Sequence, residues 1–383
     1  MKYELAKIIE TDKETAVSAA SDLSGRVLVF EKTENSDLVA CPSAITSDFF
    51  AGLFSQNGRY WQTYEKFGLG VRPSVPYLYF FGGQMYFLKN LELECVFGAG
   101  RLKEYCVKGD GAELHTPISL DSLMLLLAYP FDFARLSAAT SLLALNTPLY
   151  LNEFEKFRKE SREFCETHKN DRKFDTSVFN GCIDGAMQSM EHSFFATLSY
   201  SLNLKFPESP AWEICDAEKL GELLSIPSQE KKIAAISEFG FYALDLYDIR
   251  APRLAEDFSA NPAAPAPKNP QMRMRENAKF CLGRYFFILR NQLLLLADEK
   301  GFEDLVFHMT RFEILQLAEG IDEKTLKDAA RKRKAKNAYL EKLGNSVFPV
   351  RFVFVYVNPN GFPYADKILR NFVHDKKNGR WMK

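Results

Sequence analysis

The segment YDIRAPRLAED, residues 247–257, gathers charged side chains around one proline and lies between two apolar stretches. Its two arginines, Arg250 and Arg253, are spaced to pair with the acidic residues near them. A partly buried ion network of this kind fixes geometry more reliably than it adds stability. One interpretation is therefore a structural clamp between the preceding helix and the chain that follows. The residues of this predicted clamp are Asp248, Pro252, Glu256 and Asp257.

A second interpretation of the same segment is a binding site. A guanidinium binds anionic groups through a planar fork of N–H donors, so Arg250 or Arg253 would face an anionic or polar ligand or a mobile domain. His192 is another candidate, because it follows Glu191 on a predicted helix with an apolar stripe. It is interpreted either as a base or ligand that lines a pocket, or as a boundary histidine satisfied by a helix neighbour.

Recognisable motifs for catalysis and metal binding are absent from the sequence. It contains no GxxxxGK[ST] loop, no GxSxG elbow and no HExxH helix. The five histidines lie far apart, and the seven cysteines include no CxxC pair, which argues against a zinc site or a disulfide framework. The sequence therefore predicts no catalytic residue, no metal and no cofactor bound to this chain.

The charge balance argues against nucleic acid and membranes as partners. The 383 residues carry 49 basic and 50 acidic side chains, which provides no overall field toward an anionic polymer or surface. The basic run RKRKAK at 331–336 has no interleaved aromatic residues for base stacking, so it is interpreted as a solvated helix face. No signal-like segment or uninterrupted apolar stretch of about 18 residues is evident, which predicts a cytoplasmic protein.

Hydrophobic periodicity predicts a mainly α fold, an elongated helical domain with a few short hairpin or strand additions. Strands are predicted at GRVLVFEK (25–32), on both sides of Gly82-Gly83, and at VFPVRFVFVYV (347–357). A helix is predicted at 151–168 with Asn152 as its N-cap, and another after Thr310, which with Glu313 has the pattern of a capping box. The strongest helical pattern covers 272–301 and ends at Gly301. Its solvent faces are marked by Arg275, Lys279, Arg284 and Arg290.

Composition predicts where the chain is divided. Four prolines in FSANPAAPAPKNPQ disfavour both helix and central strand, which is typical of an extended connector. The predicted organisation is a mixed N-terminal segment with a hairpin at 1–120, a helical subdomain at 121–257, a Pro/Ala linker at 258–271, and a C-terminal helical subdomain ending in a strand at 272–383.

The segment FGFYALDLYDIRAPRLAEDF resembles a region of phosphoenolpyruvate synthase-like enzymes. That region reads Tyr-Gly-His-Arg, a short spacer, then an acidic residue, a proline and Arg-Trp-x-Glu-Asp. Phe241 and Tyr242 replace the histidine and arginine of this pattern, so a contact made there becomes apolar or aromatic. The matching residues are Gly240, Asp248, Ile249, Pro252, Arg253, Glu256 and Asp257.

The resemblance continues in two further segments. DLVFHMTRFEIL (304–315) is similar to the family's D-x-F-F-L-T-x-x-E-L segment, and CPSAITSDFFAGLF (41–54) is similar to its P-x-P-L-T segment. The region of the family that this chain resembles is the helical middle part between an N-terminal ATP-grasp domain and a C-terminal phosphohistidine domain. In the rifampicin phosphotransferase branch this middle part binds the antibiotic.

The resemblance implies an acceptor-binding and scaffolding domain of an ATP-dependent phosphotransferase. Its partners would be ATP-grasp and phosphohistidine domains, in cis or in trans, and a bulky apolar small molecule. ATP and Mg²⁺ are implied only for those partner domains, so the isolated chain is predicted to be inactive. The substrate-binding residues expected from this segment and from the helix pattern are Arg253, Arg250, His192, Phe241 and Tyr242.

Two other functions stay open. The chain would be a free-standing helical binding or scaffold protein if it works without catalytic domains. An unrelated enzyme acting through Glu191 and His192 is the remaining alternative, although no third group in the sequence orients that pair.

Overall fold

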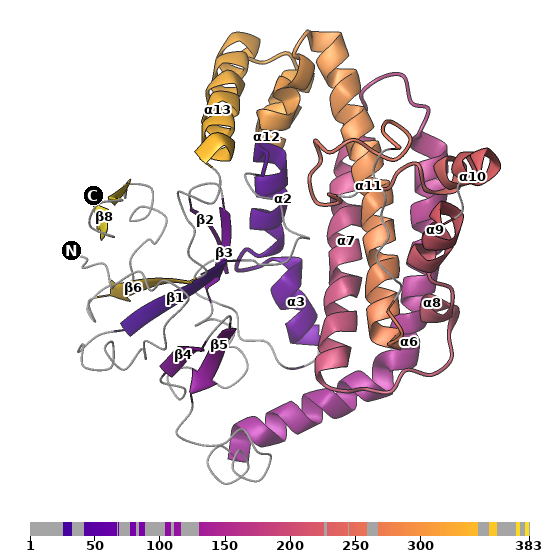
Figure 1. Ribbon diagram of the computed structural model, residues 1–383, viewed down its shortest axis with the longest axis vertical. Coiled ribbons are helices and arrows are strands. Elements are labelled where there is room, and N and C mark those ends of the chain that lie inside the picture. Colours follow the sequence, from indigo (N-terminus) through magenta and orange to yellow (C-terminus); the bar gives the residue numbers. More distant parts are fainter. Residues whose placement is uncertain are drawn as a thin grey trace. The chain divides into compact units, whose positions relative to one another are not determined.

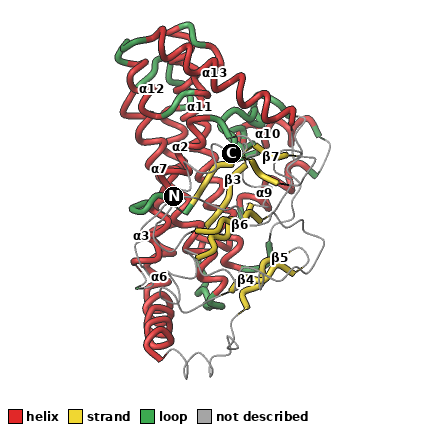
Figure 2. Tube along the Cα trace, turned by 90° about the vertical axis from the view of Figure 1, so that its left-hand side faces the viewer, coloured by secondary structure: helices red, strands yellow, loops and turns green. Residues whose placement is uncertain are grey.

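The computed structural model describes most of the helical part of the chain and several short strands (Figure 1). Figure 2 shows the same trace coloured by secondary structure, in which helices predominate among the described residues. The mainly α fold expected from the sequence is confirmed. The described residues are 26–32, 42–66, 68, 77–81, 84–88, 104–108, 111–115, 130–225, 228–243, 245–258, 267–343, 352–357, 373–375 and 380–382.

Contacts within the chain define two units, each of which is described by itself. The helices on both sides of segment 258–271, α10 (Gln229–Phe239) and α11 (Pro270–Lys300), belong to the same unit, in which α11 also packs along α7 (Thr176–Ser201). The boundary predicted at this segment therefore does not separate the two units, and residues 259–266 lie outside the described residues. Unit 1 comprises Met1–Cys41, Phe54–Ala139 and Asn337–Lys383; unit 2 comprises Pro42–Leu53 and Thr140–Lys336.

Unit 1 contains a four-stranded antiparallel sheet with the strand order β2-β3-β1-β6. In β1 and β6, Val29 lies opposite Phe354, so the sheet joins segments from near the two ends of the sequence. β2 and β3 pair as a hairpin, as predicted, and its two glycines lie outside the described residues. The strands are β1 (Arg26–Lys32), β2 (Leu78–Phe81), β3 (Gln84–Leu88) and β6 (Phe352–Val357).

The rest of unit 1 consists of short elements. Helix α3 (Arg59–Lys66) contributes Tyr60, whose ring stacks on Tyr77 with the ring centroids 5.2 Å apart. Tyr77 also stacks on Phe87 of β3 at 4.6 Å, so rings join the helix to the sheet. Two further antiparallel pairs are β4 (Glu104–Lys108) with β5 (Gly111–His115), and β7 (Val373–Asp375) with β8 (Arg380–Met382).

Unit 2 is helical in its described residues (Figure 1). Its centre is the pair α7 and α11, whose many buried apolar residues form much of the core. The other elements are α2 (Ala44–Leu53), most of α6 (Pro130–His168), α8 (Pro210–Glu213), α9 (Asp216–Leu224), α10 (Gln229–Phe239), the 3₁₀ helix η1 (Glu303–His308), α12 (Arg311–Ala318) and most of α13 (Glu323–Leu343).

The close packing of α7 and α11 depends on a glycine. A Cβ atom at Gly185 of α7 would lie 2.3 Å from the ring of Tyr285 on α11, which is far inside van der Waals contact. A side chain at position 185 would therefore force the two helices apart. α11 is also long and apolar enough to cross a membrane by length and composition alone, but 72% of its most apolar window is buried inside the protein, which is the burial of a core helix.

The helix ends follow local rules that were visible in the sequence. Thr310 and Glu313 form the predicted capping box of α12, in which each side chain accepts a hydrogen bond from the other residue's backbone N–H. Gly301 ends α11 with a φ of 65°, a left-handed conformation that glycine adopts without strain. Asn269 caps the start of α11 through two backbone N–H groups.

One predicted helix boundary is wrong. Asn152, expected to cap a new helix, lies inside α6, which continues through Pro148. Leu143, Leu151 and Phe154 are all buried, so the apolar face of the helix extends across the proline. Burial of this continuous apolar face offsets the loss of the backbone hydrogen bond that Pro148 cannot donate.

Candidate functional site

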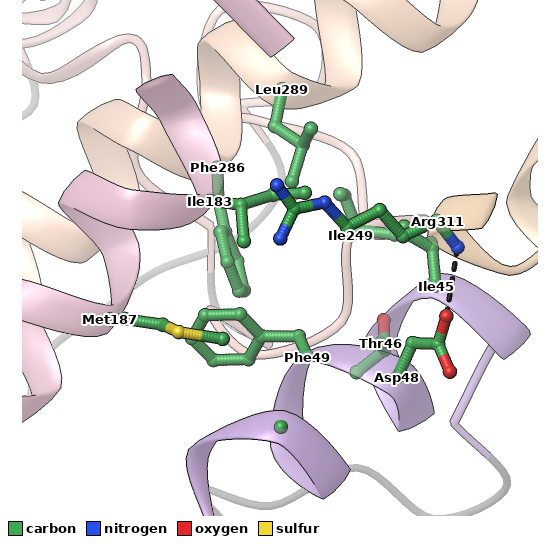
Figure 3. Close-up of a pocket in the computed structure, with 11 residues that line it drawn as sticks. Ile45, Thr46, Asp48, Phe49, Ile183, Met187, Ile249, Phe286, Leu289 and Arg311 are labelled. Atoms are coloured by element: carbon green, nitrogen blue, oxygen red, sulfur yellow. Dashed lines mark hydrogen bonds between the residues drawn. The ribbon is translucent and has the colours of Figure 1, made fainter. Parts of the chain in front are cut away.

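Unit 2 contains a largely apolar pocket with a volume of about 110 Å³ (Figure 3). Three polar residues, Thr46, Asp48 and Arg311, also line it. The pocket lies between α2, α7, α11, the start of α12 and the loop after α10. Its apolar wall residues are Ile45, Phe49, Ile183, Met187, Ile249, Phe286 and Leu289.

The walls of the pocket are positioned by aromatic packing and by one glycine. Phe49 of α2 meets the ring of Phe286 edge to face, with the ring centroids 5.2 Å apart and the planes at 77°. On the next turn of α2, Gly52 faces Met187, and a Cβ atom there would lie 3.2 Å from the terminal methyl carbon of Met187. The absence of a side chain at Gly52 leaves space for this flexible thioether, which forms one wall.

Arg311 is the cationic residue of the pocket. Its backbone N–H donates to Asp48 Oδ2 at 2.8 Å, which fixes the start of α12 against α2. Its side chain extends across the pocket toward Ile183 and Phe286 (Figure 3), and Nη2 donates to Asn180 Oδ1 at 2.7 Å. A planar donor group is thus held beside apolar walls, an arrangement that suits a ligand with one polar end.

The residues of segment 247–257 form ion pairs, but the most important external partner was not predicted. Arg250 donates to the Asp248 carboxylate through Nε at 3.1 Å and Nη2 at 2.9 Å, so this pair is local. Glu256 pairs with Arg290 of α11, with Nε and Oε1 3.2 Å apart. Arg290 Nη1 also donates to the carbonyl oxygens of Ile249 and Arg250. Arg290 therefore ties this segment to α11.

Two other residues of the predicted clamp lie at the surface. Pro252 and Asp257 are both exposed. The loop is instead closed by backbone hydrogen bonds, from Leu254 N to Tyr242 O at 2.7 Å and from Ala255 N to Gly240 O at 3.1 Å. These bonds fold residues 251–257 back against the end of α10 and so hold Ile249 at the pocket.

Arg253 is fully buried, and its charge is poorly compensated. Among the described residues, none hydrogen-bonds to its guanidinium nitrogens Nε, Nη1 and Nη2. Burial and then the positive charge of Arg290 lower the pKa of Arg253 to about 10. Such a group is costly to bury, and it does not line the pocket. The structure therefore gives Arg253 no access to a ligand in the pocket.

The other predicted binding residues lie in two different places. Phe241 and Tyr242 pack on Phe280 of α11, with Tyr242 stacked on that ring at a centroid distance of 4.9 Å. His192 of α7 is buried against Phe154 and Phe157 of α6, at centroid distances of 5.0 and 5.1 Å. None of these residues, and neither Arg250 nor Arg253, lines the pocket. The predicted binding residues therefore lie outside this pocket.

A second polar cluster in unit 2 was missed from the sequence. Asp216, at the start of α9, accepts hydrogen bonds from Arg158 Nη2 at 2.9 Å, Arg162 Nη2 at 3.1 Å and Arg284 Nη2 at 3.2 Å. Its backbone N–H donates to the buried Asn277 Oδ1 at 2.9 Å. Burial by itself raises the pKa of Asp216, but the three arginines together hold it below its ordinary value.

This Asp216 cluster corrects the predicted solvent face of the long helix. Arg284 is 5% exposed and Arg158 is 3% exposed, so both are core residues held by the carboxylate. The periodic pattern assigned Arg284 to solvent because arginines are rarely buried without a partner. Its partner, Asp216, is far away in the sequence. The one indication in the sequence was a charged residue at an otherwise apolar position of α11. The cluster links α6, α9 and α11, which is a structural role.

Metal binding finds no set of ligands in the described part of the chain. No group of three or more His, Cys, Asp or Glu residues there could hold a metal ion. The described cysteines Cys165, Cys182, Cys215 and Cys281 are buried free thiols, and burial raises the pKa of each. Nucleophilic thiol chemistry is therefore disfavoured at these four positions.

Comparison with protein-family models, with curated proteins and with solved structures finds no match to this chain.

Proposed function

We propose that this chain is the acceptor-binding and scaffolding domain of a phosphoenolpyruvate synthase-like phosphotransferase, with the pocket of unit 2 as the acceptor site. The observation that carries the proposal is the position of Ile249. This residue belongs to the segment that resembles the family, and its side chain forms part of the pocket wall. Arg290 holds the same segment against α11. The family-like loop and the pocket are thus parts of one arrangement.

The size of the pocket limits how an acceptor is bound. Its volume of about 110 Å³ is below the roughly 150 Å³ of an apolar cavity that takes up benzene. One small ring or branched group enters after a modest movement of the Met187 side chain, whose three rotatable bonds allow it. A bulky acceptor would insert one such group and leave the rest of its structure outside.

Phosphoryl transfer itself is assigned to the partner domains. It needs positioned phosphates, Mg²⁺ and a phosphohistidine, and no described residue of this chain supplies a metal donor set. The scaffolding role is supported by the Asp216 cluster, which ties three helices together through buried charge-assisted hydrogen bonds. A rigid helical support of this kind would hold the acceptor while a mobile domain delivers the phosphoryl group.

The test is phosphoryl transfer from ATP with separately supplied ATP-grasp and phosphohistidine domains and a panel of small aromatic and branched acceptors. Transfer should require this chain. Gly52→Ala should weaken it, because the new methyl group pushes Met187 into the pocket. Gly221→Ala is the matched control, since a Cβ atom at that position of α9 meets nothing within 4 Å.

The alternative is a free-standing binding protein, which is favoured by one observation. All described residues that line the pocket belong to unit 2, so ligand binding needs no second domain. Ligand binding that is weakened by Gly52→Ala, together with no acceptor that gives chain-dependent transfer, would support this alternative and contradict the phosphotransferase proposal.

A further inference from the structure

We infer that the ligand of the unit 2 pocket is a small monoanion, a carboxylate attached to one flat or branched hydrocarbon group, and that Arg311 binds the carboxylate. This inference rests on the proposed function only in taking the pocket as the ligand site. It adds the chemical class of the ligand and the residue that recognises its charge.

The first support is that the guanidinium of Arg311 is held by a neutral side chain. Its hydrogen-bond acceptor among the described residues is the amide oxygen of Asn180, not a carboxylate. Other arginines of unit 2 have acidic partners: Arg158 and Arg284 pair with Asp216, and Arg333 pairs with Glu313 at 2.6 Å. Arg311 therefore retains N–H donors for an anion that enters the pocket.

The second support is that the guanidinium is held in place before a ligand arrives. The Arg311 backbone is fixed by the hydrogen bond from its N–H to Asp48 Oδ2 and by the capping box at the start of α12. Asn180 holds one end of the guanidinium at 2.7 Å. A donor group that is ordered in advance loses less conformational entropy when it binds a ligand.

The third support concerns the charge of the ligand. Asp48 also lines the pocket, and its carboxylate lies beside the same residue that offers the guanidinium. One guanidinium can pair with one negative charge of a ligand, whereas the second charge of a dianion would be desolvated without a partner and close to the Asp48 carboxylate. A carboxylate is therefore preferred over a phosphate monoester.

The fourth support is the apolar wall. The rings of Phe49 and Phe286 and the thioether of Met187 surround the space that the guanidinium faces (Figure 3). Aromatic edges and a polarisable sulfur pack well against a flat ring or a branched alkyl group. The volume of about 110 Å³ admits only one such group. The ligand is thus defined by one anionic end and one small apolar end.

The experiment measures the binding of three probes to the full chain by ligand-detected NMR and calorimetry: benzoate, the neutral benzyl alcohol and the dianion phenyl phosphate. Benzoate should bind about tenfold or more tightly than benzyl alcohol, because the carboxylate gains charge-assisted hydrogen bonds. Arg311→Gln should abolish this preference, and Arg311→Lys should restore part of it. Arg331→Gln on the exposed face of α13 is the control and should change nothing.

Each contrary outcome overturns a distinct statement. Equal binding of benzoate and benzyl alcohol, or a preference that persists in folded Arg311→Gln, would overturn the role of Arg311. Tighter binding of phenyl phosphate would overturn the monoanion, and failure of all three probes at millimolar concentration would overturn the ligand class. The proposed function is judged separately, by whether phosphoryl transfer requires this chain. Thermal unfolding of each variant shows whether it is folded.

Discussion

Two regions of unit 2 bury arginine side chains, and they differ in how the positive charge is compensated. Around Asp216, the buried Arg158 and Arg284 both donate to one carboxylate, and Arg158 also donates to the carbonyl oxygens of Pro210 and Ile214. In the loop after α10, Arg253 is fully buried, and no described residue hydrogen-bonds to its guanidinium. The first region satisfies its buried charge, and the second does not.

This difference indicates that the two regions have different roles in the protein. A satisfied buried network fixes the helices that contribute to it, whereas removal of one partner leaves an uncompensated charge. A buried polar group without partners breaks a local rule, and such positions concentrate where structure serves something other than stability. The loop with Arg253 also holds Ile249 at the pocket wall. The buried charge of Arg253 is therefore a feature of unit 2 that a substitution can remove at little cost in stability.

The largest effect is expected from Asp216→Ala. Loss of the carboxylate leaves Arg158 and Arg284 buried without their common acceptor, which should lower the free energy of unfolding by about 3–5 kcal/mol. Urea denaturation followed by far-UV circular dichroism measures this. Glu218→Ala is the control. Glu218 pairs with Arg273 and is 48% exposed, so its loss should cost under about 1 kcal/mol. Equal losses in both variants would remove the distinction between core and surface pairs.

Arg253→Met is expected to raise the free energy of unfolding, in contrast to Asp216→Ala. Methionine fills a similar volume without a charge, so the variant should be more stable than the parent chain by about 1–3 kcal/mol. The same denaturation experiment checks this. Arg250→Met is the control and should not stabilise, because Arg250 pairs with Asp248 through Nε and Nη2. A clear loss of stability in Arg253→Met would show that the guanidinium has a compensating partner after all.

A smaller loss is expected from Arg290→Met. This change removes the charge-assisted hydrogen bonds to Glu256 and to the carbonyl oxygens of Ile249 and Arg250. The expected cost is about 1–2 kcal/mol, with faster amide hydrogen exchange confined to residues 245–257. Arg331→Met, on an exposed face, is the control. Unchanged exchange in the loop would show that the backbone bonds from Leu254 and Ala255 hold it without Arg290.

The smallest expected effects are changes of stability with pH, and they have opposite signs for Asp245, near Arg253, and for Asp216. Burial raises the pKa of Asp245 and the neighbouring Asp248 carboxylate adds to this, so the folded state takes up its proton more readily than the unfolded chain, and protonation adds stability. For Asp216 the three arginines outweigh burial and lower the pKa, so its contribution is present above about pH 3.9, the unfolded value, and is lost below that pH.

Stability measured from pH 6 to pH 3 separates these two titrations. Compared with Asp245→Asn, the parent chain should gain stability as the pH falls toward about 3.9, the unfolded value, because the raised pKa lets Asp245 take up its proton earlier in the folded state. Compared with Asp216→Asn, it should lose stability below about pH 4, as the depressed pKa is passed. Parallel pH profiles for all three proteins would contradict both assignments.

Local features of the fold were predictable because their causes are local. The capping box of Thr310 and Glu313, the left-handed Gly301 and the hairpin of β2 and β3 each depend on a few adjacent residues, and all three are present. Asn152 was mispredicted as a helix cap because the continuation of α6 depends on a buried face that spans Pro148. Propensity alone does not contain that information.

The site was less predictable than the fold, since its residues come together only by packing. The spacing of charges in 247–257 pointed to ion pairs, and Asp248 with Arg250 is such a local pair. Arg290, which holds the loop, lies on another element and looked like a solvent-facing residue. The pocket joins Phe49, Ile183, Ile249, Phe286 and Arg311 from five separate stretches of the chain. No spacing rule connects residues that are so far apart.

The sequence by itself determined that this protein is mainly helical and where several of its helices begin and end. Periodicity and capping act within a few residues, and the linear chain contains them fully. Only the tertiary structure decided which buried arginines have a carboxylate, that β1 pairs with β6, and that Arg311 faces an apolar pocket. Those outcomes depend on which distant surfaces pack together, because burial and charge compensation are properties of neighbours in space.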